Sequence, residues 1–240
     1  MIFVKNVIKK IIRLLYKIRP IGYINYCGFK LFYNRGNGLI KRYKREDLWP
    51  NFFNLLRKFV TGKNNLVFVD IGAHVGLISV FVRSINHNAT IYAFEPSPLQ
   101  RSCLEKSVNV NNLDIKVIPL AVSDSKGEVD MYVSLIGDER YDSIFPREKT
   151  KKIKVESTTF DQWVKNNNLD RLDILKIDVE GAEEKVIQGS MDSIKLFKPI
   201  IFLETAKDSN TYNTLLSLGY KIEPINYDSK NGDFVAVYNN

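Results

Sequence analysis

The stretch Val67-Phe-Val-Asp-Ile-Gly-Ala-His-Val-Gly76 decides how the rest of this chain is interpreted. An apolar, β-branched run ends at Asp70, glycines follow at Gly72 and Gly76, and an apolar segment resumes at Leu77. This pattern predicts a buried strand, a tight turn and the start of a helix. Glycines let the backbone approach a ligand closely, and Asp70 is expected where the carboxyl end of a parallel strand opens into the crevice of an α/β sheet. We therefore expect a small-molecule site at this turn.

The spacing of the turn bears on which ligand it binds. It reads Asp-x-Gly-x-x-x-Gly, which is neither the dinucleotide fingerprint Gly-x-Gly-x-x-Gly nor a P-loop with Gly-Lys-Ser/Thr. An acidic residue at the end of the strand suits a ligand with a cationic amine and no phosphates, and S-adenosylmethionine is such a ligand. Other α/β proteins also combine a strand, a glycine turn and a helix, so they remain alternatives on this evidence.

Three further predicted strands also end in acidic residues. A β-rich run from Ala89 ends at Glu95, where nucleoside-binding folds place an acid that accepts hydrogen bonds from ribose hydroxyls. The run from Asp173 delivers Asp178 and Glu180, and a run from 199 to 205 ends with Glu204. The ends of parallel strands share one crevice, and buried carboxylates are costly unless they meet a ligand, a metal or a base. A solvated strand end remains the alternative for Glu95, and a structural or capping carboxylate for Glu180 and Glu204.

The remaining segments complete the expected α/β domain. The polar stretch 134–152 predicts a mobile loop over the site, with Tyr141, Asp142 and Phe145 within reach of a substrate, or an exposed linker. Helices are expected at about 47–60, 99–110, 159–166, 182–188 and 212–218, and strands at 115–122, 128–133, 152–157, 221–225 and 234–238.

Composition supports one domain with an extension. The chain has 240 residues, of which 45% are apolar, so it can bury a sizeable core. Two cysteines, Cys27 and Cys103, are too few for a disulfide framework and indicate a reducing, cytoplasmic compartment. The two histidines, His74 and His87, cannot build a histidine-rich metal site.

The net charge of +8 belongs to the N-terminal part of the chain. Residues 1–63 carry a net charge of +13, with 15 Lys or Arg against two acids, whereas residues 64–240 carry −5. Residues 2–18 place apolar side chains along one helical face and lysines along another, which is typical of a helix on an anionic membrane surface. We therefore expect peripheral contact of residues 1–19 with the inner face of the membrane, or else packing of this helix on its own domain or a second subunit. Lysines interrupt every apolar run, so the pattern is not that of a spanning helix.

A hairpin is expected between the basic helix and the domain. Its β-rich flanks surround Asn34-Arg-Gly-Asn-Gly38, which is a dense turn signal in the span from Tyr23 to Tyr43. Residues 1–46 are thus interpreted as a helix-plus-hairpin extension, and 47–240 as the main domain.

Four motifs occur in a fixed order: Phe68-Val-Asp-Ile-Gly-Ala-His-Val-Gly-Leu-Ile-Ser79, Ala93-Phe-Glu-Pro-Ser-Pro98, Ala121-Val-Ser-Asp124 followed by Gly127, and Leu175-Lys-Ile-Asp-Val-Glu-Gly-Ala-Glu183. In this combination they resemble the FkbM family of S-adenosylmethionine-dependent methyltransferases, over roughly residues 47 to 220. One departure is His74, where the family more often has asparagine. The resemblance implies a class I methyltransferase Rossmann-like sheet of seven mostly parallel strands, the last antiparallel.

The resemblance also implies the roles of the site residues. The turn at Asp70 and Gly72 would hold the methionine moiety, Glu95 the ribose hydroxyls, and Ala121 to Asp124 the adenine. The expected donor-binding residues are Asp70, Gly72, Ala73, His74, Gly76, Glu95, Pro96, Ala121, Val122, Ser123, Asp124 and Asp178. Family members act mostly as O-methyltransferases of small molecules and glycans, so we expect such an acceptor, with a surface-polysaccharide or lipid-linked sugar as one form of it. The oligomeric state is not predicted.

Methyl transfer is an in-line displacement in which the acceptor oxygen must be aligned and lose its proton. Asp178 is the first candidate for the general base, Glu180 is the second, and Glu204 is expected to orient a hydroxyl. Alternatively, these three carboxylates hold Mg²⁺, which would acidify the hydroxyl.

Two other functions compete with this hypothesis. An RNA ribose 2′-O-methyltransferase resembles it in fold and needs a Lys-Asp-Lys-Glu tetrad, of which Asp178, Lys207 and Glu204 or Glu223 supply a part. The acidic body of the chain makes nucleic acid a poorer partner. A non-catalytic scaffold that uses residues 1–19 to bind a membrane or a protein is the alternative of another class.

Overall fold

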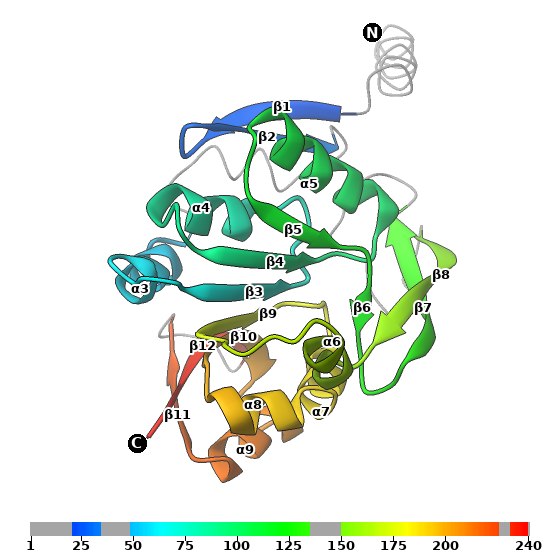
Figure 1. The fold of residues 1–240 in the computed structure, drawn as a ribbon. Helices are drawn as coiled ribbons and strands as arrows, with labels where there is room; N and C mark the ends of the chain where they lie inside the picture. The colour runs from blue at the N-terminus through cyan, green and yellow to red at the C-terminus, as the bar shows by residue number, and fades with distance from the viewer. Residues whose placement is uncertain (1–20, 35–48, 135–149, 226–230, 240) are drawn as a thin grey trace, which may run out of the picture.

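The computed structural model describes residues 21–34, 49–134, 150–225 and 231–239. A seven-stranded sheet with the strand order β11-β12-β10-β9-β3-β4-β5 forms its centre (Figure 1). The strands of this sheet are β3 (Val67–Ile71), β4 (Thr90–Phe94), β5 (Ile115–Ile118), β9 (Ile174–Ile177), β10 (Ile200–Ala206), β11 (Tyr220–Pro224) and β12 (Asn231–Tyr238).

Strand direction follows the predicted pattern. Strands β5, β4, β3, β9 and β10 pair in parallel, whereas β12 is antiparallel to both of its neighbours, β10 and β11. The five residues of β3 are all buried, as expected for a strand covered on both faces. The prediction of a mostly parallel, seven-stranded sheet whose last strand is antiparallel is confirmed.

The expected third strand, Ile115–Val122, is two strands in the structure. Strand β5 ends at Ile118, and Ala121–Val122 forms β6 in a separate sheet. Pro119 lies between them, and proline has no N–H group to donate to a continuing strand ladder. The chain therefore leaves the main sheet here.

The separate sheet has three strands in the order β6-β8-β7, where β7 is Gly127–Ser134 and β8 is Thr150–Thr158. Figure 1 shows it at the end of the main sheet toward which β3, β4 and β5 point. Lys152 pairs with Asp130 at 2.7 Å and Lys154 with Glu128 at 3.0 Å, and all four side chains are exposed. Such exposed pairs contribute little to stability, so this sheet depends on its apolar residues.

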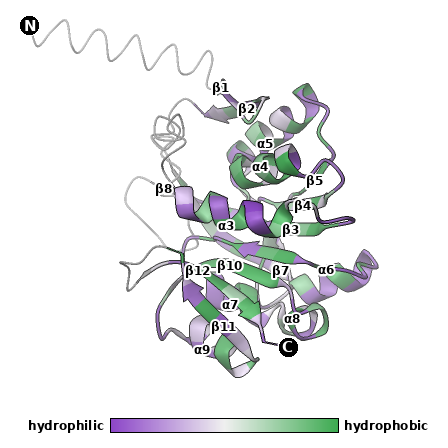
Figure 2. Ribbon diagram, turned by 90° about the vertical axis from the view of Figure 1, so that its left-hand side faces the viewer, coloured by the Kyte–Doolittle hydropathy of each residue, from purple (hydrophilic) through white to green (hydrophobic). Residues whose placement is uncertain are grey.

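Helices cover both faces of the main sheet. They are α3 (Pro50–Val60), α4 (Leu77–Ile85), α5 (Pro98–Val110), α6 (Phe160–Asn166), α7 (Glu183–Gln188), α8 (Met191–Phe197) and α9 (Asn210–Ser217). Two apolar clusters result: one joins the sheet to α3, α4 and α5, and the other joins it to α6, α7, α8 and α9. Figure 2 shows the alternating polar and apolar residues of α3, which buries Phe52, Leu56 and Val60 on one stripe. Helix α8 was not expected, because its seven residues bury just Ser193 and Ile194 and so carry little periodicity.

The structure contains a hairpin with a turn that was not predicted, whereas the expected turn after Asn34 lies outside the described residues. Strand β1 (Ile21–Tyr26) pairs with β2 (Phe29–Asn34) through a turn at Cys27-Gly28, and both turn residues have positive φ. Two residues in the left-handed region are the usual requirement of a two-residue hairpin turn, and the denser turn signal after Asn34 concealed this shorter one. The Lys30 N–H donates to Asn111 Oδ1 at 3.0 Å, which ties the hairpin to the end of α5.

Several predictions fall outside the described residues. They are the basic helix of residues 2–18 with the membrane contact of residues 1–19, the expected hairpin turn at 35–38 with the strand after it, and the loop residues Tyr141, Asp142 and Phe145. In the described ranges, no helix combines the length and the apolar character that crossing a membrane requires.

Candidate active site

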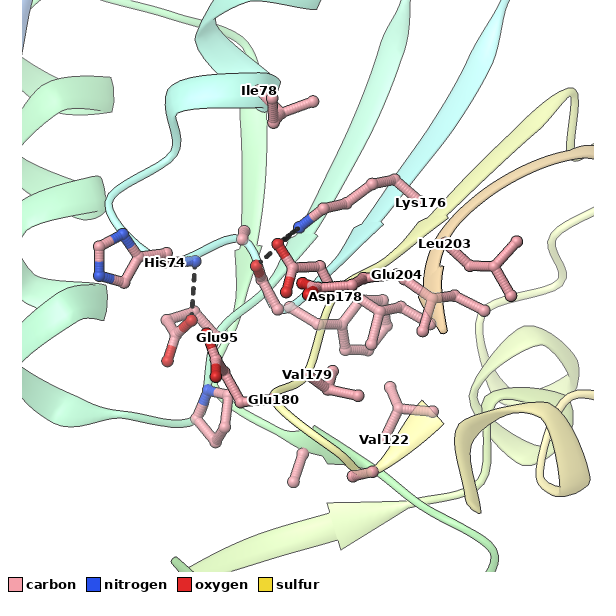
Figure 3. A pocket seen from close by; sticks show the side chains of 18 of the residues that line it. His74, Ile78, Glu95, Val122, Lys176, Asp178, Val179, Glu180, Leu203 and Glu204 are labelled. Atoms are coloured by element: carbon pink, nitrogen blue, oxygen red, sulfur yellow. Dashed lines mark hydrogen bonds and ion pairs between the residues drawn. The ribbon is translucent and has the colours of Figure 1, made fainter. Parts of the chain in front are cut away.

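A cavity of about 380 Å³ opens at the carboxyl ends of β3, β4, β9 and β10 (Figure 3). Its wall includes the turn after β3, the start of the chain after β4, the three-stranded sheet, and the facing ends of β10 and β12. At one end it is lined by apolar side chains, namely Phe94, Leu120, Val122, Val129, Met131 and Val155, and elsewhere by the carboxylates of Glu95, Asp178, Glu180, Glu204 and Asp233. Trp49 and Phe52 of the α3 region line a third part of the wall.

Gly72 brings the turn after β3 into contact with the chain after β9. Its φ is +78°, and a Cβ at this position would lie 1.8 Å from the carbonyl oxygen of Asp178. The N–H groups of Gly72 and Ala73 both donate to the Phe94 carbonyl, at 3.0 and 2.9 Å. The Asp178 N–H donates to the carbonyl of Ile71 at 3.1 Å. The main chain of three strand ends is therefore locked together at this glycine.

Glu95 fixes the same turn from β4. One carboxylate oxygen accepts from the His74 N–H at 2.7 Å, and the other accepts from the Ser97 N–H at 2.8 Å. Glu95 is 5% exposed and lines the cavity. A carboxylate held by two main-chain donors has a fixed position, and carboxylate oxygens are acceptors to which a ligand hydroxyl can donate.

His74 has φ of +56°, a region that histidine and asparagine enter more readily than most residues. Its Nε2 atom is buried. Burial and the nearby charge of Lys176 together lower the pKa of His74 to about 4, against the opposing effect of Asp70. The imidazole is therefore neutral at physiological pH.

Asp70 supports the cavity from beneath. It is fully buried, its Oδ2 accepts from the Ser79 hydroxyl at 2.7 Å, and its Oδ1 lies 3.0 Å from Lys176 Nζ. Lys176 lies directly beside Asp70 in the register of β3 and β9. The expected direct contact of Asp70 with a ligand is not supported by this geometry.

Lys176 is a functional candidate that the sequence analysis missed. It is 6% exposed and lines the cavity, and its Nζ donates to the Gly72 carbonyl at 2.9 Å. Burial disfavours its charge, but the carboxylates of Asp70 and Asp178 outweigh burial and raise the pKa of Lys176. The motif Leu-Lys-Ile-Asp contained this lysine, but its pairing with Asp70 depends on a register between strands 106 residues apart in sequence.

Carboxylates follow one another along the rim of the sheet. Asp178 comes directly after β9, Glu204 lies on β10, and Asp233 lies opposite Glu204 in the register of β12. Like charges at facing positions destabilise a sheet. Partial burial, together with the charges of Asp178, Asp233, Glu180 and Glu183, raises the pKa of Glu204 to about 7. Burial also raises the pKa of Asp233, as does Asp178, while Lys176 opposes the rise.

Asp233 was not predicted as a site residue. An antiparallel strand begins at the edge where its parallel neighbours end, so an acid near its start lies in the same crevice. Applying this rule to the acid before Phe234 would have identified it.

The structure divides the expected site residues into two groups. The cavity is lined by Gly72, Ala73, His74, Glu95, Pro96, Ala121, Val122, Asp178, Glu180 and Glu204, but not by Asp70, Gly76, Ser123 or Asp124. Gly76 instead begins α4, where a Cβ would lie 2.3 Å from Leu104 Cδ1. Ser123 is buried, with its N–H donating to Thr158, and Asp124 is exposed beyond the cavity wall. Direct ligand contact is thus not supported for these four residues.

The described carboxylates give no support for a metal site. Among the described residues, no group of three or more His, Cys, Asp or Glu side chains is arranged to hold a metal ion. The expected Mg²⁺ site on Asp178, Glu180 and Glu204 therefore lacks support, and we carry it no further.

The crowding of carboxylates predicts a pH-dependent stability. The pKa of Glu204 is raised from an ordinary value of 4.5 to about 7, so the folded chain binds more protons than the unfolded chain between these pH values. The contribution of Glu204 to stability therefore falls as pH rises through this window. We expect Glu204→Gln to raise Tm at about pH 8 and to leave it nearly unchanged at about pH 4. Thermal unfolding, with Glu156→Gln on exposed β8 as the control, measures this. An equal gain at both pH values would contradict it.

Comparisons with known proteins converge on one family. The family model described as "Methyltransferase FkbM domain" matches residues 70–222, which is more than half of the chain. The chain is 27% identical to "Methyltransferase sdnD" of Sordaria araneosa over 160 residues, covering 52% of this chain and 61% of that protein. It is 25% identical to "2-O-methyltransferase NoeI" of Sinorhizobium fredii (strain NBRC 101917 / NGR234) over 190 residues, covering 65% of this chain and 77% of that protein.

A solved structure shares the fold. The crystal structure of methyltransferase FkbM from Methylobacillus flagellatus KT matches with a TM-score of 0.52 and 16% sequence identity. The match covers 72% of this chain and 44% of the other. The chain thus spans less than two thirds of that protein and of the Sordaria protein.

Proposed function

The chain belongs to the FkbM methyltransferase family, and from that premise we propose that it transfers a methyl group from S-adenosylmethionine to a hydroxyl oxygen of a small-molecule or glycan acceptor. The observation that carries the proposal is the single cavity that joins the Gly72 turn to the carboxylate of Asp178. A donor seated against this turn and an acceptor beside Asp178 share one space, as an in-line displacement requires.

The donor end of the cavity fits S-adenosylmethionine. The absence of a side chain at Gly72 lets the turn pack against the main chain of Asp178, and Gly72 itself lines the cavity with main-chain atoms alone. Glu95 offers fixed carboxylate oxygens to ribose hydroxyls, and the apolar wall that includes Leu120 and Val122 suits a planar base. When bound, the donor supplies an electrophilic methyl group on a sulfonium.

The chain's own residues then handle the acceptor. Asp178 is half-buried beside the cavity and is placed to accept the proton of the acceptor hydroxyl. Glu204, on the neighbouring strand, is placed to orient a second hydroxyl. An oxygen acceptor is supported by the relative from Sinorhizobium fredii, which is named a 2-O-methyltransferase.

Nucleic acid fits this site less well. Lys176 is the one lysine or arginine among the described residues that line the cavity, and Asp70 and Asp178 already pair with it. The carboxylates of Glu180, Glu204 and Asp233 face the same space. A phosphate backbone requires basic groups, so the RNA alternative has no support from the described site.

Calorimetric titration with S-adenosylmethionine tests the proposal directly. We expect binding in the micromolar range, competition by S-adenosylhomocysteine, and no binding of NAD, because the turn lacks the diphosphate fingerprint. Product release is then followed with hydroxylated small molecules, glycans and RNA as acceptors. A folded chain that does not bind the donor would remove the methyltransferase proposal, and turnover on RNA alone would replace the acceptor class.

A further inference from the structure

We propose that Lys176 is a positioning residue whose buried ammonium connects the donor-binding turn to the acceptor carboxylate, by holding the Gly72 carbonyl and Asp178 at the same time. This inference rests on the proposed function, because that function makes the Gly72 turn the donor site and Asp178 the acceptor base. The contacts of Lys176 with both are observed whatever the function is.

The register of the sheet places Lys176 under both ends. It lies between Asp70 on β3 and Phe202 on β10, two residues before Asp178 and level with the residue two before Glu204. Successive residues of a strand alternate between faces, so Asp70, Lys176 and Asp178 share the face covered by α3 and α4. Figure 3 shows the Lys176 side chain extending toward Asp178. Its Nζ lies 3.7 Å from Asp178 Oδ2, at the carboxyl end of the strands.

The ammonium has as many oxygen partners as it has protons. Lys176 Nζ is 2.9 Å from the Gly72 carbonyl, 3.0 Å from Asp70 Oδ1 and 3.7 Å from Asp178 Oδ2. The ammonium thus donates a hydrogen bond to the Gly72 carbonyl and forms ion pairs with the carboxylates of Asp70 and Asp178. A lysine that served Asp70 alone would not need contact with the turn or with the carboxylate at the rim.

These contacts act on the two reacting ends in different ways. The peptide unit between Gly72 and Ala73 is held at its N–H by the Phe94 carbonyl and at its carbonyl by Lys176, so this unit has one orientation. Asp178 is 45% exposed, and the ammonium is its one ion-pair partner among the described residues. Removal of the ammonium would therefore loosen the Gly72 carbonyl and leave the Asp178 carboxylate without this ion pair.

A charge-balanced pair of substitutions separates positioning from simple burial of charge. Lys176→Met alone leaves Asp70 charged and buried without its partner, so we expect a clear loss of Tm. The double variant Asp70→Asn/Lys176→Met removes both charges and keeps an oxygen that accepts from Ser79. Lys154→Met, at an exposed ion pair on β8, is the control for the substitution itself.

We expect the double variant to recover most of the Tm that Lys176→Met loses, but to bind S-adenosylmethionine at least tenfold more weakly than the natural chain. Asp70→Asn alone keeps the ammonium and should bind within about threefold of it. Wild-type affinity in the double variant, or a tenfold loss in Asp70→Asn, would overturn the inference. If the double variant does not fold, the affinity of Asp70→Asn is the test: a value within about threefold of the natural chain agrees with the inference, and a tenfold loss contradicts it.

Hydrogen–deuterium exchange gives a readout that needs no ligand. Peptides covering residues 70–76 should exchange faster in the double variant, or in Lys176→Met if the double variant does not fold, while peptides of β1 and β2 should not change. Unchanged exchange at 70–76 would overturn the inference. A natural chain that binds no donor, yet shows faster exchange on substitution, would refute the proposed function and leave the positioning role intact.

Discussion

Alanine at position 72 is expected to abolish binding of S-adenosylmethionine and to lower the free energy of unfolding. Gly72 has φ of +78°, where a side chain costs about 1–2 kcal/mol. The new Cβ would also lie 1.8 Å from the Asp178 carbonyl oxygen, which is main chain and cannot rotate away. Relief of that overlap moves two strand ends apart, and overpacking of this kind costs roughly another 1–3 kcal/mol. Thermal unfolding and calorimetric titration measure the two effects.

Gly62→Ala is the matched control for this prediction. Gly62 has φ of +72°, but a Cβ there would meet no atom within 4 Å. The two variants therefore share the backbone strain and differ in the overlap with Asp178. We expect Gly62→Ala to lose stability modestly and to bind the donor normally. If Gly72→Ala binds the donor as Gly62→Ala does, the turn is not the donor site.

The parts of the fold that follow from local pattern were predicted from the sequence. The turn from Val67 to Leu77 combines a β-branched run, positive-φ glycines and a resumed apolar segment, and each feature is visible within ten residues. The same holds for Glu95, since its strand ends at two prolines. The hairpin turn at Cys27-Gly28 was not predicted, because the turn signal in the sequence after Asn34 is stronger than the signal of these two residues.

The parts of the site that depend on strand order could not be predicted in the same way. Lys176 and Asp70 are neighbours because β9 inserts beside β3, and Asp233 faces Glu204 because β12 returns antiparallel between β10 and β11. Before these pairings are known, Lys176 reads as a charge that interrupts an apolar strand. Asp70 is the opposite case, because it was expected in the site and is not part of the cavity wall. The sequence predicts its place at the strand end, but its contacts with Ser79 and Lys176 keep the side chain buried.

Asp178→Asn is expected to lower the rate of methyl transfer by roughly 10²–10⁴-fold, the usual contribution of a positioned general base. Asparagine keeps the shape of the side chain but cannot take the proton of an acceptor hydroxyl. Donor affinity should stay within about threefold of the natural chain, because the Gly72 turn contacts the Asp178 main chain and not its carboxylate. The measurement is release of S-adenosylhomocysteine, with an acceptor identified in the screen above, over a range of pH.

One control variant and one comparison variant distinguish Asp178 from Glu204 as the base. Asp192→Asn, on an exposed position of α8, should leave the rate unchanged. Glu204→Gln should raise the KM for the acceptor more than it lowers kcat, if Glu204 orients a hydroxyl and does not take its proton. A hundredfold loss of kcat in Glu204→Gln with a nearly normal rate in Asp178→Asn would exchange the two roles. Because burial and its neighbours raise the pKa of Glu204 to about 7, the natural chain would then show a rate that rises with pH through about 7, and this rise would vanish in Glu204→Gln.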